Sequence, residues 1–476
     1  MVSLLSSYAS QFATTATNLV TKLLLARLIA PDDLGLYALA LLVLLGCDML
    51  VDLGVSQHII REKHRPYGNL LVLRLSVAVV LFTIVELIAG KLRFWGAEFP
   101  PVMSALAVVI LIKAVSGVPN LFLDRELLIQ RSVLPQFLRL LATGAVSIGL
   151  ASFHYGVWAL VWGTIAGEMA FALTIWKAAR GRMPIELTWK HSAGLIWGSK
   201  FLFLIGCMGF ALQQGDIAII GTLLDSRQVG YYTLAYTLVI LVSKVVESAI
   251  FRVIYPMFCE YKDDLRNLGR TYRQATLAVI AIEAPIYFYL LFNAPVVVSV
   301  LLGEKWMPAA FLMQALSVYG IINPFSTFGN EVLRARKRDN ILTLSTAIGA
   351  ATLMTSGYIL TLRYGTIGMV AANYIMIGSI PAILTVYKTV RQDFTKLAGQ
   401  LGIVYSTSFA VIAVASAGLS LAAHTQALVA GLLVPVCWYT YYRIFGNGLG
   451  RKMIDTLMAA RSAAAVEAGL QGGASS

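Results

Sequence analysis

Charged residues are scarce in this sequence. Asp, Glu, Lys and Arg make up 13% of its 476 residues and apolar residues 58%, whereas a soluble globular chain carries roughly 25% charged residues. This scarcity excludes a mainly water-soluble protein. One crossing of a hydrocarbon core about 30 Å thick needs ~20 apolar residues, so the chain is long enough to cross a dozen times or more.

Several chemical signatures are also missing. The four cysteines Cys47, Cys207, Cys259 and Cys437 show no CxxC spacing, so neither disulfides nor structural zinc are expected. No GxxxxGK[ST] phosphate loop and no HExxH zinc pattern occurs. The loops between apolar segments are too short for a catalytic region. We therefore expect no enzyme activity and no cofactor, with coupling to the membrane potential or to an ion left open.

The apolar segments predict an all-α polytopic membrane protein of about fourteen transmembrane helices. The first segment follows an N-terminus without a charged n-region and has no small-residue cleavage site, so it is expected to be a retained helix. Cutting the chain at its polar stretches gives spans near 3–27, 34–57, 69–92, 100–123, 134–153, 157–179, 195–224, 229–256, 274–302, 308–331, 340–362, 366–390, 397–421 and 425–445.

Lys and Arg residues are concentrated in every second loop between the predicted spans. With a cytoplasmic N-terminus, the cytoplasmic loops and the tail hold 24 Lys and Arg residues, and the opposite loops hold six. Such a bias sets membrane orientation through the positive-inside rule. It predicts that both termini are cytoplasmic, and it explains the net charge of +13 without nucleic acid as a partner.

The two halves of the sequence resemble each other. Leu34–Ala40 reappears as Val229–Ala235 at an offset of 195 residues, and Tyr155-Gly156 reappears as Tyr364-Gly365. The repeat predicts two parallel six-helix units with substrate held between them. The expected division is an N-terminal lobe at 1–180, a C-terminal lobe at 191–391, helices 13 and 14 at 396–446, and a cytoplasmic tail at 447–476.

Three stretches resemble the polysaccharide transporter family, the oligosaccharide flippases of the superfamily that also holds the multidrug and toxic-compound exporters. They are Ala26–Tyr37, Gly215–Gly221 and Leu302–Trp306 with Pro308. Pro31-Asp32-Asp33 also suits a tight loop and a helix N-cap, so these residues can identify the family without forming its substrate site.

The resemblance implies two lobes around a central cavity, in the bacterial inner membrane. It also implies outward transfer of undecaprenyl-pyrophosphate-linked oligosaccharide for exopolysaccharide, O-antigen or capsule. The expected partners are this lipid-linked oligosaccharide and the membrane lipids, with a polysaccharide polymerase and chain-length machinery as further candidates.

Polar residues within the spans are the candidate cavity residues, because a charge at mid-bilayer costs ~2.5–3.5 kcal/mol unless it meets water or a partner. Several recur at three- or four-residue spacing and so share a helical face. The candidates are Gln11, Asn18, Lys22, Asp48, Asp52, Lys113, Asn120, Gln213, Asp216, Lys244 and Glu247. Asp52 maps onto Glu247 under the 195-residue offset.

Two interpretations of these charges remain open. Cations could attract pyrophosphate in a hydrated cavity while amides and carboxylates bind sugar hydroxyls, or the charges could pair internally and fix the helices. Arg74, Arg139, Lys200 and Arg252 lie near the predicted cytoplasmic ends, where their side chains can snorkel to the interface.

Two other functions remain as alternatives to the flippase. A multidrug or cation antiporter of the same superfamily should have a cavity dominated by acids and aromatics. Basic residues in the first, fourth and eighth spans favour anionic lipid-linked cargo instead. A membrane scaffold of polysaccharide assembly without transport is the third reading.

Overall fold

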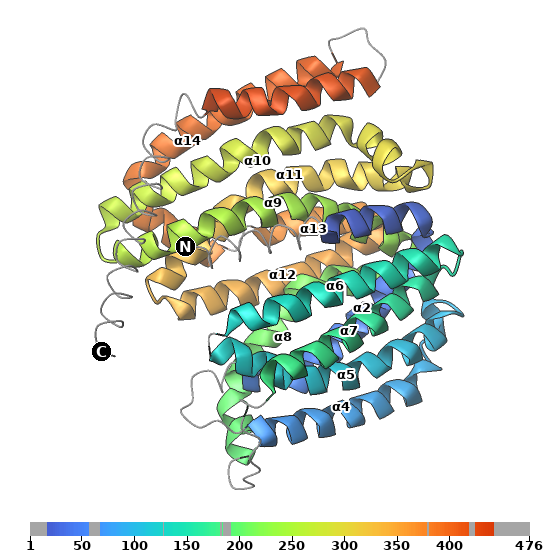
Figure 1. Cartoon of the computed structure of the whole chain (residues 1–476). Helices are drawn as coiled ribbons and strands as arrows, with labels where there is room; N and C mark the ends of the chain where they lie inside the picture. Colours follow the sequence, from blue (N-terminus) through green and yellow to red (C-terminus); the bar gives the residue numbers. More distant parts are fainter. Residues whose placement is uncertain are drawn as a thin grey trace, which may run out of the picture. The chain divides into compact units, whose positions relative to one another are not determined.

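The computed structural model describes residues 17–56, 67–126, 128–180, 183, 192–377, 380–417 and 424–441. Within these ranges the regular secondary structure is helical and there is no strand (Figure 1). The chain divides into two compact units. The first is Met1–Thr233 with Ser299–Pro308 and Leu353–Met369, and the second is Leu234–Val298 with Ala309–Thr352 and Val370–Ser476.

The first unit is built around one inner helix. Its helices are residues 17–28, α2 (Pro31–Asp52), α4 (Tyr67–Ala89), α5 (Phe99–Arg125), α6 (Ile129–Ser152), α7 (Val157–Ala179), α8 (Ser192–Leu223) and the start of α9 (Ser226–Glu260). Helix α5 packs against α2, α4 and α7, and α6 packs along α7. The apolar segment of α5 is 56% buried but those of α4 and α6 only 17%, so most side chains of α4 and α6 are partly or fully exposed.

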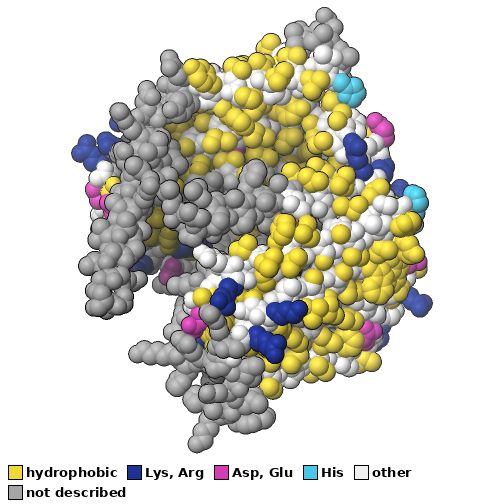
Figure 2. All heavy atoms as spheres, viewed as in Figure 1, with side chains coloured by type: hydrophobic (Ala, Val, Ile, Leu, Met, Phe, Trp, Pro, Cys, Tyr) yellow, Lys and Arg dark blue, Asp and Glu magenta, His cyan; other side chains and the backbone are white. Residues whose placement is uncertain are grey.

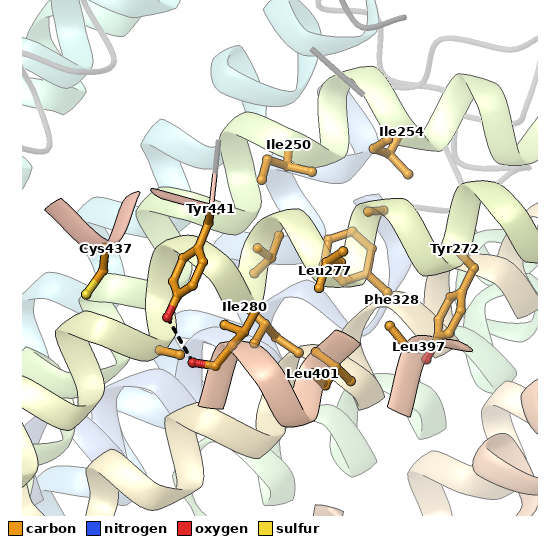
Figure 3. Packing of buried hydrophobic residues seen from close by; sticks show 14 of the residues in the cluster. Ile250, Ile254, Tyr272, Leu277, Ile280, Phe328, Leu397, Leu401, Cys437 and Tyr441 are labelled. Carbon is orange, nitrogen blue, oxygen red and sulfur yellow. Dashed lines mark hydrogen bonds between the residues drawn. The ribbon is translucent and has the colours of Figure 1, made fainter. Parts of the chain in front are cut away.

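The second unit contains most of the remaining helices. These are the rest of α9, most of α10 (Leu265–Leu301) and α11 (Met307–Ala335), the first half of α12 (Asp339–Tyr364), most of α13 (Thr366–Ile377), α14 (Ile380–Ala417) and residues 424–441. The second half of α12 and the start of α13 belong to the first unit. Its hydrophobic core joins side chains of α9, α10, α11, α14 and 424–441, including Ile254, Ile280, Phe328 and Leu401 (Figure 3). In the same core the Tyr441 hydroxyl donates a hydrogen bond to the Val404 carbonyl at 2.9 Å.

The outer surface of the described helices is largely apolar. Side chains such as Leu87, Leu173, Leu362 and Leu432 are 59–74% exposed, and the face drawn in Figure 2 is covered mostly by hydrophobic side chains where it is not grey. Ten of the described helices are long and apolar enough to cross a membrane. These features confirm an all-α, multi-pass membrane protein, while the count of fourteen helices stays a prediction.

Hydropathy located the helices better than it located their ends. Helices α2, α4, α5, α6, α7, α8 and α12 lie within a few residues of the predicted spans. The prediction was wrong around residue 391, because α14 runs unbroken from Ile380 to Ala417 through the expected polar loop. The stretch from 382 to 398 contains no proline or glycine, and Lys, Arg and Gln are good helix formers. Polar composition alone therefore does not end a helix.

Residues related by the repeat have matching structures. Gly156 and Gly365, which open α7 and α13, both have positive φ values of 55° and 62°. At the crossing of α2 and α9, Gly35 lies against Gly230, 195 positions later. A Cβ added to Gly35 would be 1.7 Å from the Ser226 carbonyl oxygen, and one added to Gly230 would be 2.1 Å from the Pro31 carbonyl oxygen. Only glycine permits backbones to approach this closely.

Candidate substrate site

A polar cavity in the first unit gathers several predicted residues. Asp48 and Asp52 are four residues apart on α2, so their side chains share one helical face. They line a cavity of about 510 Å³ together with Arg74 of α4 and Gln213 of α8. The rest of the lining is Leu45, Met49, Ile205, Gly206, Gly209, Phe210 and Gln214. The cavity thus combines both signs of charge, amides and an apolar wall.

An ion pair between Arg74 and Asp52 is the strongest polar interaction in this cavity. Arg74 Nη1 lies 2.7 Å from Asp52 Oδ1, with the Arg74 side chain 8% and the Asp52 side chain 29% exposed. Ser56 Oγ accepts a second bond from Arg74 Nη1 at 3.1 Å and donates a short one to Asp52. A Cβ at Gly117 of α5 would be 2.7 Å from Arg74 Nη2, so glycine makes room for the guanidinium.

Arg74 was expected to snorkel, and the structure shows otherwise. The residue is 6% exposed, and its guanidinium reaches the cavity rather than the interface. The sequence does hold a pattern that could have indicated this inward position of Arg74. The arginine lies in α4, and Asp48 and Asp52 share one face of α2. Arg139, by contrast, is 44% exposed at its side chain and pairs with Glu168 at 3.5 Å.

Lys113 of α5 pairs with the second aspartate of the cavity. Its Nζ lies 3.3 Å from Asp48 Oδ2, with the side chains 20% and 35% exposed. Lys113 is therefore paired internally, as one interpretation expected. Its partner Asp48 lines the cavity, so the pair also lies at the candidate substrate site. In the first unit the two cavity acids are each matched by a cation.

Other predicted residues lie elsewhere. Asn18 and Lys22 have exposed side chains on the helix of residues 17–28, and Asn120 Nδ2 donates to Asp124 Oδ2 at 3.1 Å. Asp216 is 3% exposed and accepts hydrogen bonds from the Tyr232 hydroxyl and the Ile217 amide, both at 2.8 Å. These bonds make Asp216 a link between α8 and α9 outside the cavity lining. Gln11 lies outside the described residues.

The second unit holds the two predicted residues of α9 beyond Thr233. The Lys244 side chain is exposed and that of Glu247 is half-buried. Asn323 Nδ2 of α11 approaches Glu247 Oε1 at 3.5 Å. The Thr327 hydroxyl, which donates to the Asn323 carbonyl at 3.2 Å, lies near the same carboxyl group. Glu247 thus lies in a polar patch of α9 and α11.

Two of the family-like stretches contact each other within the first unit. Trp306 is fully buried, and its Nε1 donates to the Ala26 carbonyl at 2.6 Å. Lys305 Nζ donates to the carbonyls of Arg27 and Ile29 at 2.7 and 2.8 Å. These bonds satisfy carbonyls at the end of the helix of residues 17–28, so the stretches stabilise the turn before α2.

The aspartates after this turn, in the first turn of α2, have different partners from those expected. Ala30 is the N-cap of α2 and Pro31 occupies the first turn, without a side-chain cap, so the N-cap prediction for Pro31-Asp32-Asp33 was wrong. Asp33 instead accepts a hydrogen bond from the Val157 amide at the start of α7. Asp32 pairs with Arg227 at 2.8 Å. Proline at the first helical position removes one of the amide groups that would lack a partner at this end of α2.

No group of three or more His, Cys, Asp or Glu side chains that could hold a metal ion occurs in the part of the chain that the structure describes.

The fold matches solved transporters. A structure titled lipid II flippase MurJ, inward closed conformation, aligns with a TM-score of 0.75 over 92% of this chain and 98% of that one, at 14% identity. An inward-facing multidrug resistance transporter of the MATE family aligns with a TM-score of 0.59 over 81% of this chain and 95% of that one, at 17% identity. The class defined is a multi-pass membrane protein with a transporter fold.

Sequence comparison then places the chain within that class. A family model described as polysaccharide biosynthesis protein matches residues 24–311, more than half of the chain. The chain belongs to this family, which confirms the resemblance seen in the sequence.

Two relatives align along similar lengths. The succinoglycan biosynthesis transport protein ExoT of Rhizobium meliloti (strain 1021) is 23% identical over 335 residues, 68% of this chain and 66% of that protein. The lipopolysaccharide biosynthesis protein WzxC of Escherichia coli (strain K12) is 22% identical over 343 residues, which are 68% of this chain and 67% of that protein. The chain thus spans about two thirds of the length of these relatives.

Proposed function

We propose that this protein is a flippase that moves undecaprenyl-pyrophosphate-linked oligosaccharide across the bacterial inner membrane for surface polysaccharide synthesis. Its family, and relatives named for succinoglycan transport and lipopolysaccharide biosynthesis, support this function. The structural observation that carries it is the buried Arg74 guanidinium at a polar cavity among membrane-spanning helices.

Arg74 is suited to hold the pyrophosphate. A guanidinium presents planar, paired donors that match phosphate oxygens and remains charged at any physiological pH. In the structure one of these donors, Nη1, is engaged by Asp52 and Ser56, while Nε has no hydrogen-bond partner among the described residues. Cargo phosphate would compete with Asp52 for Arg74. The displaced carboxylate would then be free to accept hydrogen bonds from sugar hydroxyls.

The remaining lining suits a sugar. Gln213 and Gln214 supply amide donors and acceptors, and Asp48 supplies a carboxylate. A cavity of about 510 Å³ is in the size range of pockets that enclose one small ligand. We infer that it takes the pyrophosphate and the sugar next to it, while the rest of the repeat unit extends beyond.

Cation pairing disfavours a multidrug exporter. Such a protein needs uncompensated acids to attract lipophilic cations, yet Asp48 and Asp52 already have Lys113 and Arg74 as partners. The resting cavity is close to neutral, so an anion can bind by exchanging ion-pair partners.

The membrane potential can drive this transport without a nucleotide. For an anionic cargo that leaves a negative-inside cytoplasm, the membrane potential makes export more favourable by ~2.3 kcal/mol per full charge per 100 mV. The bias of basic residues toward one set of loops supports cytoplasmic termini. A polysaccharide polymerase and chain-length machinery are the partners expected to take the delivered cargo.

Deletion of the gene in its host tests this function. We expect surface polysaccharide to be lost and lipid-linked repeat units to accumulate on the cytoplasmic leaflet, with resistance to cationic dyes unchanged. Restoration by the wild-type gene is the control. Normal polysaccharide together with a loss of dye resistance would support the antiporter and contradict the flippase.

A further inference from the structure

The turn between α11 and α12 carries a high density of positive charge. Arg336, Lys337 and Arg338 are its three residues, and Arg334 precedes them in the last turn of α11. The side chains of Lys337 and Arg338 are exposed, and that of Arg336 is half-buried. Lys337 has a positive φ of 54°, a backbone conformation that glycine adopts with less strain than lysine. The shape of the turn therefore gives no reason for a lysine at this position.

The corresponding turn of the first unit has a different composition. It joins α5 to α6, and its three residues are Glu126-Leu127-Leu128. In both turns an amide donates to the carbonyl oxygen five residues earlier, at 2.8 Å in the first unit and 2.9 Å in the second. The two turns thus close in the same way, and the parallel repeat predicts that they lie on the same side of the membrane. Neither the fold nor the orientation explains three consecutive cations in one turn and none in the other.

Carboxylates of the chain compensate only part of this charge. Arg334 pairs with Glu331 at 2.8 Å. Among the described residues, no carboxylate oxygen lies within 4 Å of a Lys337 or Arg338 side-chain nitrogen. Asp339 lies in the first turn of α12, where its charge favours the amino end of the helix. The exposed cations of the turn are therefore available to an anion from outside the chain.

The beginning of α10 adds two further cations. Arg266 and Arg270 are exposed and four residues apart, so they share a face of α10. Leu268, between them, is buried in the same hydrophobic core as Leu333 in the last turn of α11. Asp264 accepts a hydrogen bond from the Arg266 amide at 3.1 Å, so it serves the start of the helix. Both basic segments thus flank one core of the second unit.

Exposed apolar side chains lie beyond these cations. On α12, Leu344 and Ile348 are 53% and 38% exposed and share one face of the helix. Leu344 follows Arg338 by about 9 Å along the helix axis. At the start of α10, Leu265 is 45% exposed next to Arg266. Cations beside an apolar surface match a ligand that has both an anionic group and hydrocarbon chains.

We propose that residues 336–338, together with Arg266 and Arg270, bind the phosphate group of an anionic phospholipid whose acyl chains lie along α12. Guanidinium groups match phosphate oxygens with paired donors, and clusters of Lys and Arg at the ends of membrane helices attract anionic headgroups. A soluble phosphate would leave the apolar surface unused. The site is independent of the cargo, so this proposal does not rest on the flippase function.

Native mass spectrometry of the purified full-length protein in detergent measures lipid binding directly. We expect phosphatidylglycerol to stay bound under conditions in which phosphatidylcholine, with the same chains and no net charge, dissociates. The combined variant Arg336→Gln, Lys337→Gln and Arg338→Gln should bind phosphatidylglycerol roughly a hundredfold more weakly. Its binding of phosphatidylcholine should not change. Added salt should weaken the wild-type complex with phosphatidylglycerol, because the headgroup contacts are exposed.

The matched control removes three exposed cations of the first unit, as Lys91→Gln, Arg93→Gln and Arg363→Gln, and should keep wild-type binding. Melting temperatures show which variants are folded. If the combined variant does not fold, Lys337→Gln alone should still weaken phosphatidylglycerol binding about fivefold.

Three results would overturn the proposal. They are wild-type phosphatidylglycerol binding by the folded turn variant, an equal loss of binding in the control, and full displacement of the lipid by inorganic phosphate, which would indicate a site for a soluble anion. Cargo transport is not measured in any of these experiments, so failure of this proposal and failure of the flippase function remain distinguishable.

Discussion

Arg74 shows how a single buried cation can prepare a membrane cavity for an anion. Its guanidinium is held by Asp52 and Ser56 and fits against α5 because Gly117 has no side chain. Removing one member of a buried ion pair is more harmful than replacing both, since the remaining charge loses its partner in a poorly hydrated place. This asymmetry allows stability and cargo binding to be separated experimentally.

For Arg74→Gln we predict lower stability and loss of flipping. The broken pair should lower the free energy of unfolding by about 3 kcal/mol, the lower end of the range for such pairs, because the Asp52 side chain is 29% exposed. Adding Asp52→Asn should recover most of the stability, since no charge then remains unpaired. Flipping should stay absent in the double variant if the guanidinium binds pyrophosphate.

Thermal unfolding in detergent and flipping in liposomes measure the two effects. Arg334→Gln is the matched control, because Arg334 is 54% exposed and belongs to an i,i+3 pair with Glu331. Such pairs contribute little to stability. Full flipping by the stable double variant would show that Arg74 serves structure only.

Residue types in the sequence predicted part of this site. Asp48, Asp52 and Gln213 line one cavity and Lys113 pairs with Asp48, as helical spacing and the cost of membrane charge suggested. The same reasoning could not tell that Asp216 is bonded to Tyr232, or that Arg74 points inward. Periodicity identifies which residues share a face of a helix, but partners on other helices depend on tertiary packing.

At the scale of helices, the crossing of α2 and α9 depends on two glycines. Gly35 and Gly230 let the two backbones approach until a Cβ would collide with a carbonyl oxygen. The pair Asp32–Arg227, also 195 residues apart, lies beside them. The matching stretches identified in the sequence as repeats, at the starts of α2 and α9, therefore meet in space, which hydropathy alone could not reveal.

We predict that Gly35→Ala destabilises the protein. The new Cβ would lie 1.7 Å from the Ser226 carbonyl oxygen, so α2 and α9 must separate, and overpacking of this kind costs about 1–3 kcal/mol. Gly149→Ala in α6 is the control, since no atom lies within 4 Å of its Cβ position. Helix propensity should make that variant neutral or more stable by up to ~1 kcal/mol.

Thermal unfolding of the purified variants decides this prediction. Equal melting temperatures for Gly35→Ala and the wild type would mean that the helices do not cross as closely as the structure shows.

Most helices were predictable in outline because their apolar length is set by the membrane, whereas their ends depend on local caps and on proline and glycine.

At the scale of the whole molecule, positions that the sequence repeat relates carry different chemistry in the two units. The first unit pairs its cavity acids with Arg74 and Lys113, while Glu247 and Glu283 in the second have no such partner among the described residues. The sequence predicted the repeat and the acid at equivalent positions. It did not predict Glu283, because its polar neighbour at helical spacing is the aromatic Tyr287, which did not mark a polar helical face.

Flipping of a defined cargo by the purified protein tests the central claim most directly. A fluorescent undecaprenyl-pyrophosphate-linked sugar in the inner leaflet of liposomes should become accessible to an external reducing quencher only when the protein is present, and faster with an outward-favouring potential. An undecaprenyl analogue without pyrophosphate should move more slowly. Equal rates with and without protein, or transport of a cationic dye in place of the lipid-linked sugar, would contradict the account.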